Sequence, residues 1–318
     1  MINLSIENEG YTYNPPVLDG IKWSTERQGV PGKLTFEVVK NGDLNFQEGN
    51  PVKLYVDEKP VFFGFVFQKK RDKGETISVT AYDQLRYLKN KDTYVYENKK
   101  ASEFIEMIAK DVGLTCGEIA DTEYVIENDI QDNKTFFDMI QDTLDTTLKN
   151  TKKIFVLYDN FGKLTLKNIE DMKVNYIVMP ATAENFDYST SIDGETYNQI
   201  KLSYDNKETG KRDIYIAMHS ENINKWGLLQ MYEKVQSGTG IPDRALAMLS
   251  LYNRKSRSLS IKNALGDLDV RAGSSVGVAL NLGDIEVNSF FICEKVTHTF
   301  KGDMHLMDLS LRGSDFIV

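Results

Sequence analysis

The side chains of this sequence that could do chemistry are few, and the histidines are the most suggestive. Three occur, His219, His298 and His305. The last two bracket the segment Lys301-Gly302-Asp303, so a hairpin there would bring the two imidazoles together. A metal site would need a third ligand at a fixed spacing, and the sequence offers none. We therefore predict structural histidines and no metal.

Other signatures of catalysis are equally weak. Neither Cys116 nor Cys293 lies in a Cys/His signature, and both are predicted to be buried thiols. The run Ser237-Gly238-Thr239-Gly240 lacks the Lys-Ser/Thr of a phosphate loop, which favours a flexible connection. Carboxylates are so numerous that no glycosidase-type pair stands out. We predict no catalytic residue, no cofactor and no enzyme activity.

The charge of the chain limits its partners. The net charge is −9 and the pI is near 5.1, which argues against non-specific nucleic-acid binding as the main role. The densest basic run, Lys69-Lys70-Arg71-Asp72-Lys73, precedes Gly74 and is predicted to be a solvated loop. No apolar run approaches the roughly 18–20 residues that span a bilayer, and the start has no signal-peptide pattern. We expect no stable membrane insertion and a cytoplasmic place of assembly.

Two stretches near opposite ends of the chain are similar enough to be copies of one β-unit. Gly42-Asp43-Leu44-Asn45-Phe46, then Gly49 and Val52, match Gly266-Asp267-Leu268-Asp269-Val270, then Gly273 and Val276, with a constant offset of 224 residues. After a slip of four residues the match resumes at an offset of 228, where Phe62-Phe63 pairs with Phe290-Phe291. Glycines and strand alternation kept in step over such a length indicate two similar domains.

The repeat defines the residues that we expect to matter structurally. Its glycines are predicted to permit turn conformations: Gly42, Gly49, Gly266 and Gly273. Asp43 and Asp267 are predicted to hydrogen-bond the backbone of those turns. The run 62–67 is more apolar than a strand with one buried face requires. It therefore predicts either a one-sided core or an interface with another domain or subunit, formed by Phe62, Phe63, Phe65, Phe290 and Phe291.

Periodicity divides the chain into three parts. Short alternating strands separated by turns predict an N-terminal antiparallel β-barrel at 1–92. Helical stripes, including Phe104, Ile105 and Ile108 before Gly113, predict a small α+β domain at 93–180, with its second helix starting after Asp132-Asn133. A polar linker is expected at 180–194. A second β-barrel is expected at 181–318, with an inserted helix at 242–253. The predicted fold is mostly β with α+β, two similar barrels flanking the α+β domain.

The order of several motifs resembles a known family. Trp226-Gly227-Leu228-Leu229-Gln230 is followed by the helix 245–253, by Gly266-Asp267-Leu268, and by Thr297-His298-Thr299-Phe300. In the middle part, Lys134-Thr135-Phe136-Phe137 precedes Phe155-Val156-Leu157-Tyr158. This order is similar to the XkdQ-type baseplate hub proteins of phage-like contractile tails, which are related to the late-control-D hub proteins.

The resemblance implies a non-enzymatic, trimeric ring. Two barrels per chain would give the ring pseudo-sixfold symmetry, and it would join the tail tube protein to the central spike protein beside other baseplate proteins. Its channel would pass DNA in a phage, or open a pore in a bacteriocin, and the mature location would be a virion or extracellular tail particle. The alternatives are a tail-associated cell-wall hydrolase, testable by a zymogram, and a receptor- or glycan-binding tail-tip module, testable on a glycan array.

Overall fold

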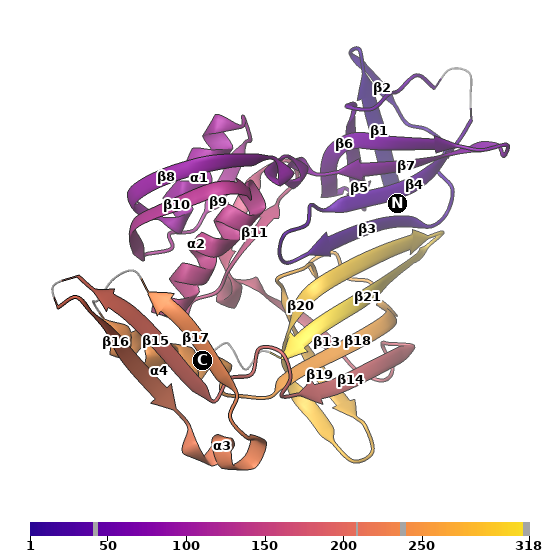
Figure 1. Cartoon of the computed structure of the whole chain (residues 1–318). Helices are drawn as coiled ribbons and strands as arrows, with labels where there is room; N and C mark the ends of the chain where they lie inside the picture. The colour runs from indigo at the N-terminus through magenta and orange to yellow at the C-terminus, as the bar shows by residue number, and fades with distance from the viewer. Residues whose placement is uncertain (41–43, 208, 236–239, 314–318) are drawn as a thin grey trace.

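The computed structural model describes residues 1–40, 44–207, 209–235 and 240–313. The predicted turn residues Gly42 and Asp43 lie outside these ranges, as do the first three residues of the glycine-rich run. Figure 1 shows four modules, which we call the N-module, the middle module, the inserted module and the C-module. Each has its own buried apolar cluster.

One sheet runs through both ends of the chain. Among the described residues it contains thirteen strands in two parts. The N-module contributes β1 (Ile2–Asn8), β2 (Tyr11–Tyr13), β3 (Ile21–Glu26), β4 (Lys33–Val39), β5 (Pro51–Val56), β6 (Lys59–Arg71) and β7 (Thr76–Tyr82). The C-module contributes β13 (Lys173–Val178), β14 (Asn185–Ser191), β18 (Ser256–Leu265), β19 (Ser275–Asn281), β20 (Glu286–Lys301) and β21 (Met304–Gly313).

Alternation of apolar and polar residues builds these strands. In β5, Val52, Leu54 and Val56 are buried while the residues between them are partly exposed. An antiparallel sheet with one face on the core requires this period of two. The predicted alternation in the N-module is therefore confirmed.

The two halves of the sheet are not closed, separate barrels, which corrects the predicted fold. No strand pairing in the described part of the chain closes either half on itself. The reason is β20, whose first part pairs with β19 and whose second part, Lys295–Phe300, pairs with β3. One long strand thus belongs to both modules, and Figure 1 shows β20 beside β3 where they meet.

The middle module is α+β, as predicted. It contains β8 (Lys91–Lys100), α1 (Ala101–Asp111), β9 (Cys116–Ile119), β10 (Val125–Thr135), α2 (Phe136–Thr151), β11 (Phe155–Asp159) and β12 (Leu164–Asn168). Short 3₁₀ turns connect it to the modules on either side, η1 (Gln84–Lys89) and η2 (Ile169–Met172).

The helix boundaries of the middle module differ in one place from the prediction. Helix α1 ends before Gly113, whose φ of +70° fits the predicted left-handed residue. Helix α2 starts later than expected. Thr135 caps it by accepting the N–H of Asp138 at 3.1 Å, whereas Asp132 and Asn133 lie in β10.

The inserted module is larger than the single helix expected at 242–253. It consists of β15 (Gln199–Asn206), β16 (Lys211–Met218), α3 (Ser220–Trp226), β17 (Gln230–Val235) and α4 (Ile241–Tyr252). Its three strands form their own sheet, with β17 parallel to β15. The whole module enters after β14 and leaves before β18, two strands that pair with each other.

The segment expected to be a linker at 180–194 contains β14. Six of its seven residues are exposed, so no apolar alternation marks it in the sequence. In the described part of the chain, none of the helices combines the length and the apolar character needed to cross a bilayer.

Candidate functional site: a junction between two equivalent modules

The N-module and the C-module form the same backbone hydrogen bonds at corresponding glycines. The N–H of Gly49 donates to the carbonyl oxygen of Val66 at 2.7 Å, and the N–H of Gly273 donates to that of Cys293 at 2.7 Å. The N–H of Val66 in turn donates to the oxygen of Asn50, just as that of Cys293 donates to the oxygen of Ser274. The repeat seen in the sequence is therefore a repeat of structure.

The same hydrogen bonds correct the register of the repeat. Cys293 follows Val66 by 227 residues, whereas Gly273 follows Gly49 by 224, so the slip is three residues rather than four. Both long strands carry an irregularity at the same place, between Val66 and Gln68 in β6 and between Cys293 and Lys295 in β20. A one-residue error in register turns a side chain to the other face of a sheet. It explains why Phe62 is buried while its supposed counterpart Phe290 is exposed.

The predicted turn glycines serve two different purposes. Gly49 and Gly273 have φ values of +90° and +92°, a region that residues with a Cβ rarely adopt. The backbone of Gly266 is not in that region, but a Cβ there would lie 2.1 Å from the His305 ring, so the position needs a residue without a side chain. Asp267 accepts the N–H of Asp269 at 2.9 Å, within its own turn.

The junction of the modules is the antiparallel pair β3–β20. Ser24 and Thr297 lie opposite each other with their hydroxyl oxygens 3.0 Å apart. Beside them, Arg27 Nε donates to Glu294 Oε2 at 2.9 Å, and that guanidinium is largely shielded from solvent. The junction thus combines backbone pairing with a partly buried ion pair, which stabilises one relative position of the two modules.

The hairpin does bring His298 and His305 together, at the centre of this junction. Nδ1 of His298 lies 2.8 Å from Nε2 of His305, and Nε2 of His298 lies 2.9 Å from the carbonyl oxygen of Val270. Because a carbonyl only accepts, Nε2 of His298 carries the proton and its Nδ1 accepts from His305. Trp23 stacks on the His298 ring at 4.7 Å between centroids.

This environment keeps the pair neutral. Burial, and secondarily the neighbouring His305, lower the pKa of His298 to about 3, and burial also lowers the pKa of His305. Both ring nitrogens of His298 are engaged in hydrogen bonds. In the described ranges no three metal-ligating side chains cluster.

A buried ionic centre joins three modules. Asp83, beside the N-module, accepts the N–H of Gly32 at 2.9 Å. Arg271 of the C-module donates to the backbone oxygen of Asp159 in the middle module at 3.0 Å, and its guanidinium lies 3.8 Å from the centroid of the Tyr158 ring. Burial raises the pKa of Asp159 to about 6 and that of Asp83 well above its usual range, while Arg271 opposes both changes. Asp83 and Asp159 are the buried carboxylates that sequence reasoning missed, because burial of a charge is not visible in a sequence.

The phenylalanines proposed as an interface lie in three different environments. Phe62 and Phe291 are buried in the cores of the two modules. Phe63 packs its ring 6.0 Å from that of Phe161, on the hairpin β11–β12 of the middle module. Phe65 contacts Tyr87 of η1. Phe290 is 49% exposed, with the ammonium of Lys173 near its ring.

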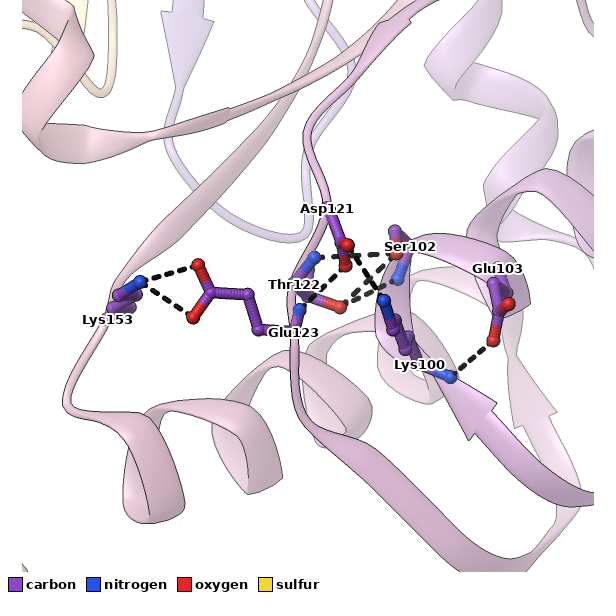
Figure 2. Close-up of polar contacts among 7 residues, drawn as sticks. All are labelled: Lys100, Ser102, Glu103, Asp121, Thr122, Glu123 and Lys153. Atoms are coloured by element: carbon purple, nitrogen blue, oxygen red, sulfur yellow. Dashed lines mark hydrogen bonds and ion pairs between the residues drawn. The ribbon is translucent and has the colours of Figure 1, made fainter.

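A polar cluster at the start of α1 in the middle module makes structural contacts. Figure 2 shows Lys100 pairing with Asp121, and Ser102 bonded to the fully buried Thr122. If Ser102 were a nucleophile, Lys100 would have to accept its proton. The hydrogen bond to Asp121 raises the pKa of Lys100, so the amine holds its proton and is a poor base. Thr122 instead accepts the Ser102 N–H at 3.1 Å and so satisfies a donor in the first turn of α1. On the other side of the same loop, Lys153 binds both carboxylate oxygens of Glu123 at 2.7 Å.

One hydrolase-like motif escaped the sequence reasoning. Residues 273–277 match Gly-x-Ser-x-Gly, but Ser275 is fully buried at the start of β19, and its hydroxyl has no hydrogen-bond partner among the residues that the structure describes. A nucleophile elbow exposes its serine between a strand and a helix. The motif here belongs to the repeated glycine turn. Of the two cysteines, Cys293 is buried as predicted, whereas Cys116 is exposed because β9 lies at a sheet edge.

An open, polar cleft of about 1230 Å³ separates the middle and inserted modules. Glu233 of β17 binds Lys149 of α2 at 2.8 Å and Arg244 of α4 at 2.6 Å. The Lys149–Glu233 pair connects the inserted module to the middle one, whereas the Arg244–Glu233 pair lies within the inserted module. Among the described residues that line the cleft, these contacts are structural.

The fold places this chain in a structural class. It superposes on a prophage MuSo2 43 kDa tail protein from Shewanella oneidensis with a TM-score of 0.74 and 11% identity, covering 99% of this chain and 100% of the other. A prophage tail protein from Listeria monocytogenes superposes with a TM-score of 0.63 and 12% identity, over 97% and 94% of the two chains. The fold is thus that of phage tail proteins.

The family follows from the sequence comparison. The YqbQ-like family model matches residues 21–312, and the chain belongs to this family. It is 29% identical over 306 residues to the phage-like element PBSX protein XkdQ of Bacillus subtilis, covering 93% of this chain and 92% of that one. It is 28% identical over 305 residues to YqbQ of the same organism, with the same coverage. The resemblance drawn from the motifs is confirmed.

Proposed function

We propose that this chain is the structural hub of a contractile phage or phage-tail-like baseplate. Three copies would form a ring that encloses a channel and joins the tail tube to a central spike. The functional units would be 1–92, 93–180 and 181–318, the last carrying the inserted module and completed by β13 from the end of the second unit. The chain would assemble in the cytoplasm and act in the finished particle.

The observation that carries this proposal is the equivalence of the two modules, down to the hydrogen bonds of Gly49 and Gly273. A chain with two equivalent modules presents six similar surfaces when three copies form a closed ring. Such a ring can meet a sixfold tube on one side and a threefold spike on the other. The relatives named as tail proteins support the same role.

The remaining parts fit a protein of interfaces rather than of chemistry. The middle and inserted modules, which lie together on one side of the long sheet in Figure 1, would contact the spike and other baseplate proteins. The net charge of −9 suits a channel through which DNA passes only as cargo, since a wall without basic clusters does not retain a polyanion.

The native mass tests the proposal. Light scattering across a concentration series, for the chain alone and after co-expression with its tube protein, is expected to reveal a species near three times 36.2 kDa. A monomer at every concentration in both preparations would contradict the ring.

A further inference from the structure

Strand β14 is the C-module's equivalent of β3. Each lies beside the equivalent strand of its own module, β3 next to β4 and β14 next to β18. Trp23 pairs with Leu34 and Tyr188 with Leu259, and Leu34 and Leu259 pair in turn with Ala81 of β7 and Leu311 of β21. At this alignment, Trp23-Ser24-Thr25 of β3 matches Tyr188-Ser189-Thr190 of β14.

The second edges of the two strands differ. The second edge of β3 is occupied by β20, and Ile21, Trp23 and Thr25 are at most 6% exposed. On the second edge of β14 the described part of the chain places no strand, and Phe186 is 38% exposed. An open strand edge presents unpaired N–H and C=O groups and is a template for another strand.

The complementary open edge lies on β6. In β20, the stretch Lys295–Phe300 receives β3 on the edge opposite to β21. The equivalent of Lys295 is Gln68, and the stretch Gln68–Arg71 of β6 pairs with β7 on one edge. Its other edge has no strand partner within the described residues, because β5 ends its pairing at Phe65.

We propose that β14 of one copy pairs antiparallel with Gln68–Arg71 of β6 in a second copy, repeating the β3–β20 pairing between chains. The pairing rests on the proposed function, because it specifies the contact that closes the ring. Transfer of the intrachain register places Ser191 opposite Gln68, Thr190 opposite Lys69, Ser189 opposite Lys70 and Tyr188 opposite Arg71. Intrachain and interchain junctions then alternate, and three copies contain six.

The side chains at these positions complement one another. Arg71 meets the ring of Tyr188, where the intrachain junction stacks His298 on Trp23. One residue further on, the same register places Asp187 of β14 opposite Asp72, a like-charge pair, with Lys70 as the neighbouring cation on that face. Lys69 is already paired with Glu48 of its own chain at 3.6 Å. Within the chain, Thr25 accepts the N–H of Ala272 at 3.0 Å, so Thr190 would accept that of Glu48 in the neighbour. The basic run predicted to be a solvated loop lies partly in strand β6, because β6 extends to Arg71. In the proposed pairing this part of the run would belong to an interface.

The intrachain junction also has features that the second junction lacks. The ion pairs Arg27–Glu294 and Glu26–Lys295 correspond to Ile192–Phe67 and Ser191–Gln68. An apolar and a neutral pair replace two ion pairs. The contact between chains therefore lacks the two ion pairs that fix the contact within a chain.

Disulfide trapping in the full-length chain tests the register. Ser189→Cys with Lys70→Cys, in a Cys116→Ser background that removes the exposed thiol, places two thiols opposite each other. The equivalent hydroxyls of Ser24 and Thr297 are 3.0 Å apart, a geometry within reach of a disulfide. We expect mild oxidation to give a covalent trimer on a non-reducing gel.

Two matched variants serve as controls. Thr190→Cys with Lys70→Cys shifts one thiol to the opposite face of the strand and is expected not to cross-link. Ser24→Cys with Thr297→Cys is expected to form an intrachain disulfide without a change in mass, which verifies the oxidation conditions and the fold.

The outcomes separate this proposal from the proposed function. A light-scattering trimer whose Ser189→Cys/Lys70→Cys form stays unlinked, while the intrachain control is oxidised, would overturn the β14–β6 pairing and leave the ring standing. Equal cross-linking of the shifted pair would overturn the register. A monomer in every preparation, with no cross-link, would overturn both.

Discussion

Acid should weaken the chain through His298, and the size of the effect follows from its burial. The pKa of His298 is lowered from 6.5 to about 3 in the folded chain. Between those values the unfolded chain binds a proton that the folded chain does not, so stability is complete above pH 6.5 and falls as the pH drops towards 3. At about 1.4 kcal/mol per pH unit, lowering the pH from 7.5 to 5 should cost about 2 kcal/mol.

Urea unfolding followed by tryptophan fluorescence measures this, because Trp23 stacks directly on His298. A Trp226→Phe background leaves Trp23 as the only fluorescent indole. His298→Phe keeps the stacked ring but removes the titrating group. It should be less stable at pH 7.5, since the oxygen of Val270 loses its donor. It should also lose about 2 kcal/mol less than the parent on going to pH 5.

The comparison between the two proteins isolates the histidine. Asp83 and Asp159 have raised pKa values, so their contribution runs the other way and stability from them falls as the pH rises. They are present in both proteins and cancel in the difference. Equal acid losses in parent and variant would refute the assignment of acid sensitivity to His298.

Three further predictions concern other parts of the fold. Gly273→Ala should destabilise the chain more than Gly49→Ala, by about 1–3 kcal/mol. Both substitutions strain a positive φ, but only the new Cβ at 273 would clash, with Val156 at 2.7 Å. Thermal unfolding compares the two variants, and equal losses of stability would contradict the clash. Arg271→Met should lower the free energy of unfolding by about 3 kcal/mol at pH 7.5 and by less at pH 5. At pH 5 Asp159 is protonated and no longer needs a neighbouring cation. Urea unfolding at both pH values should show this difference, and a loss independent of pH would argue against the charge interaction. Phe63→Ala should lower the free energy of unfolding by about 2 kcal/mol and weaken the contact between the N-module and the middle module, because Phe63 packs on Phe161. Limited proteolysis at the connection between these modules should become faster. An unchanged digestion pattern would show that this contact does not hold the modules together.

The sequence predicted those parts of the fold that carry a strong local signal. Alternation identified the strands of the N-module, and the glycine spacing identified the repeat. The sequence missed β14 because an edge strand with both faces exposed has no apolar alternation. It also placed the phenylalanine pair one residue out of register, since only the hydrogen bonds of Val66 and Cys293 reveal the three-residue slip.

Sequence reasoning could not show how the modules join. The pairing of β3 with β20 connects residues more than 260 positions apart and depends on one strand being long enough to serve two sheets. The buried centre formed by Asp83, Asp159 and Arg271 likewise arises only when three modules meet. The hairpin that unites His298 and His305 was a local feature, and it was anticipated.

The inserted module has a consequence for how such a chain can be altered. Its entry and exit lie side by side, because Ser191 and Ser256 are opposite residues of β14 and β18. The strands that flank it would therefore accept a short turn in its place, or a foreign domain whose termini are close together. The protein could in this way exchange one attachment surface for another in a single genetic step, while the long sheet, which would build the proposed ring, keeps its register.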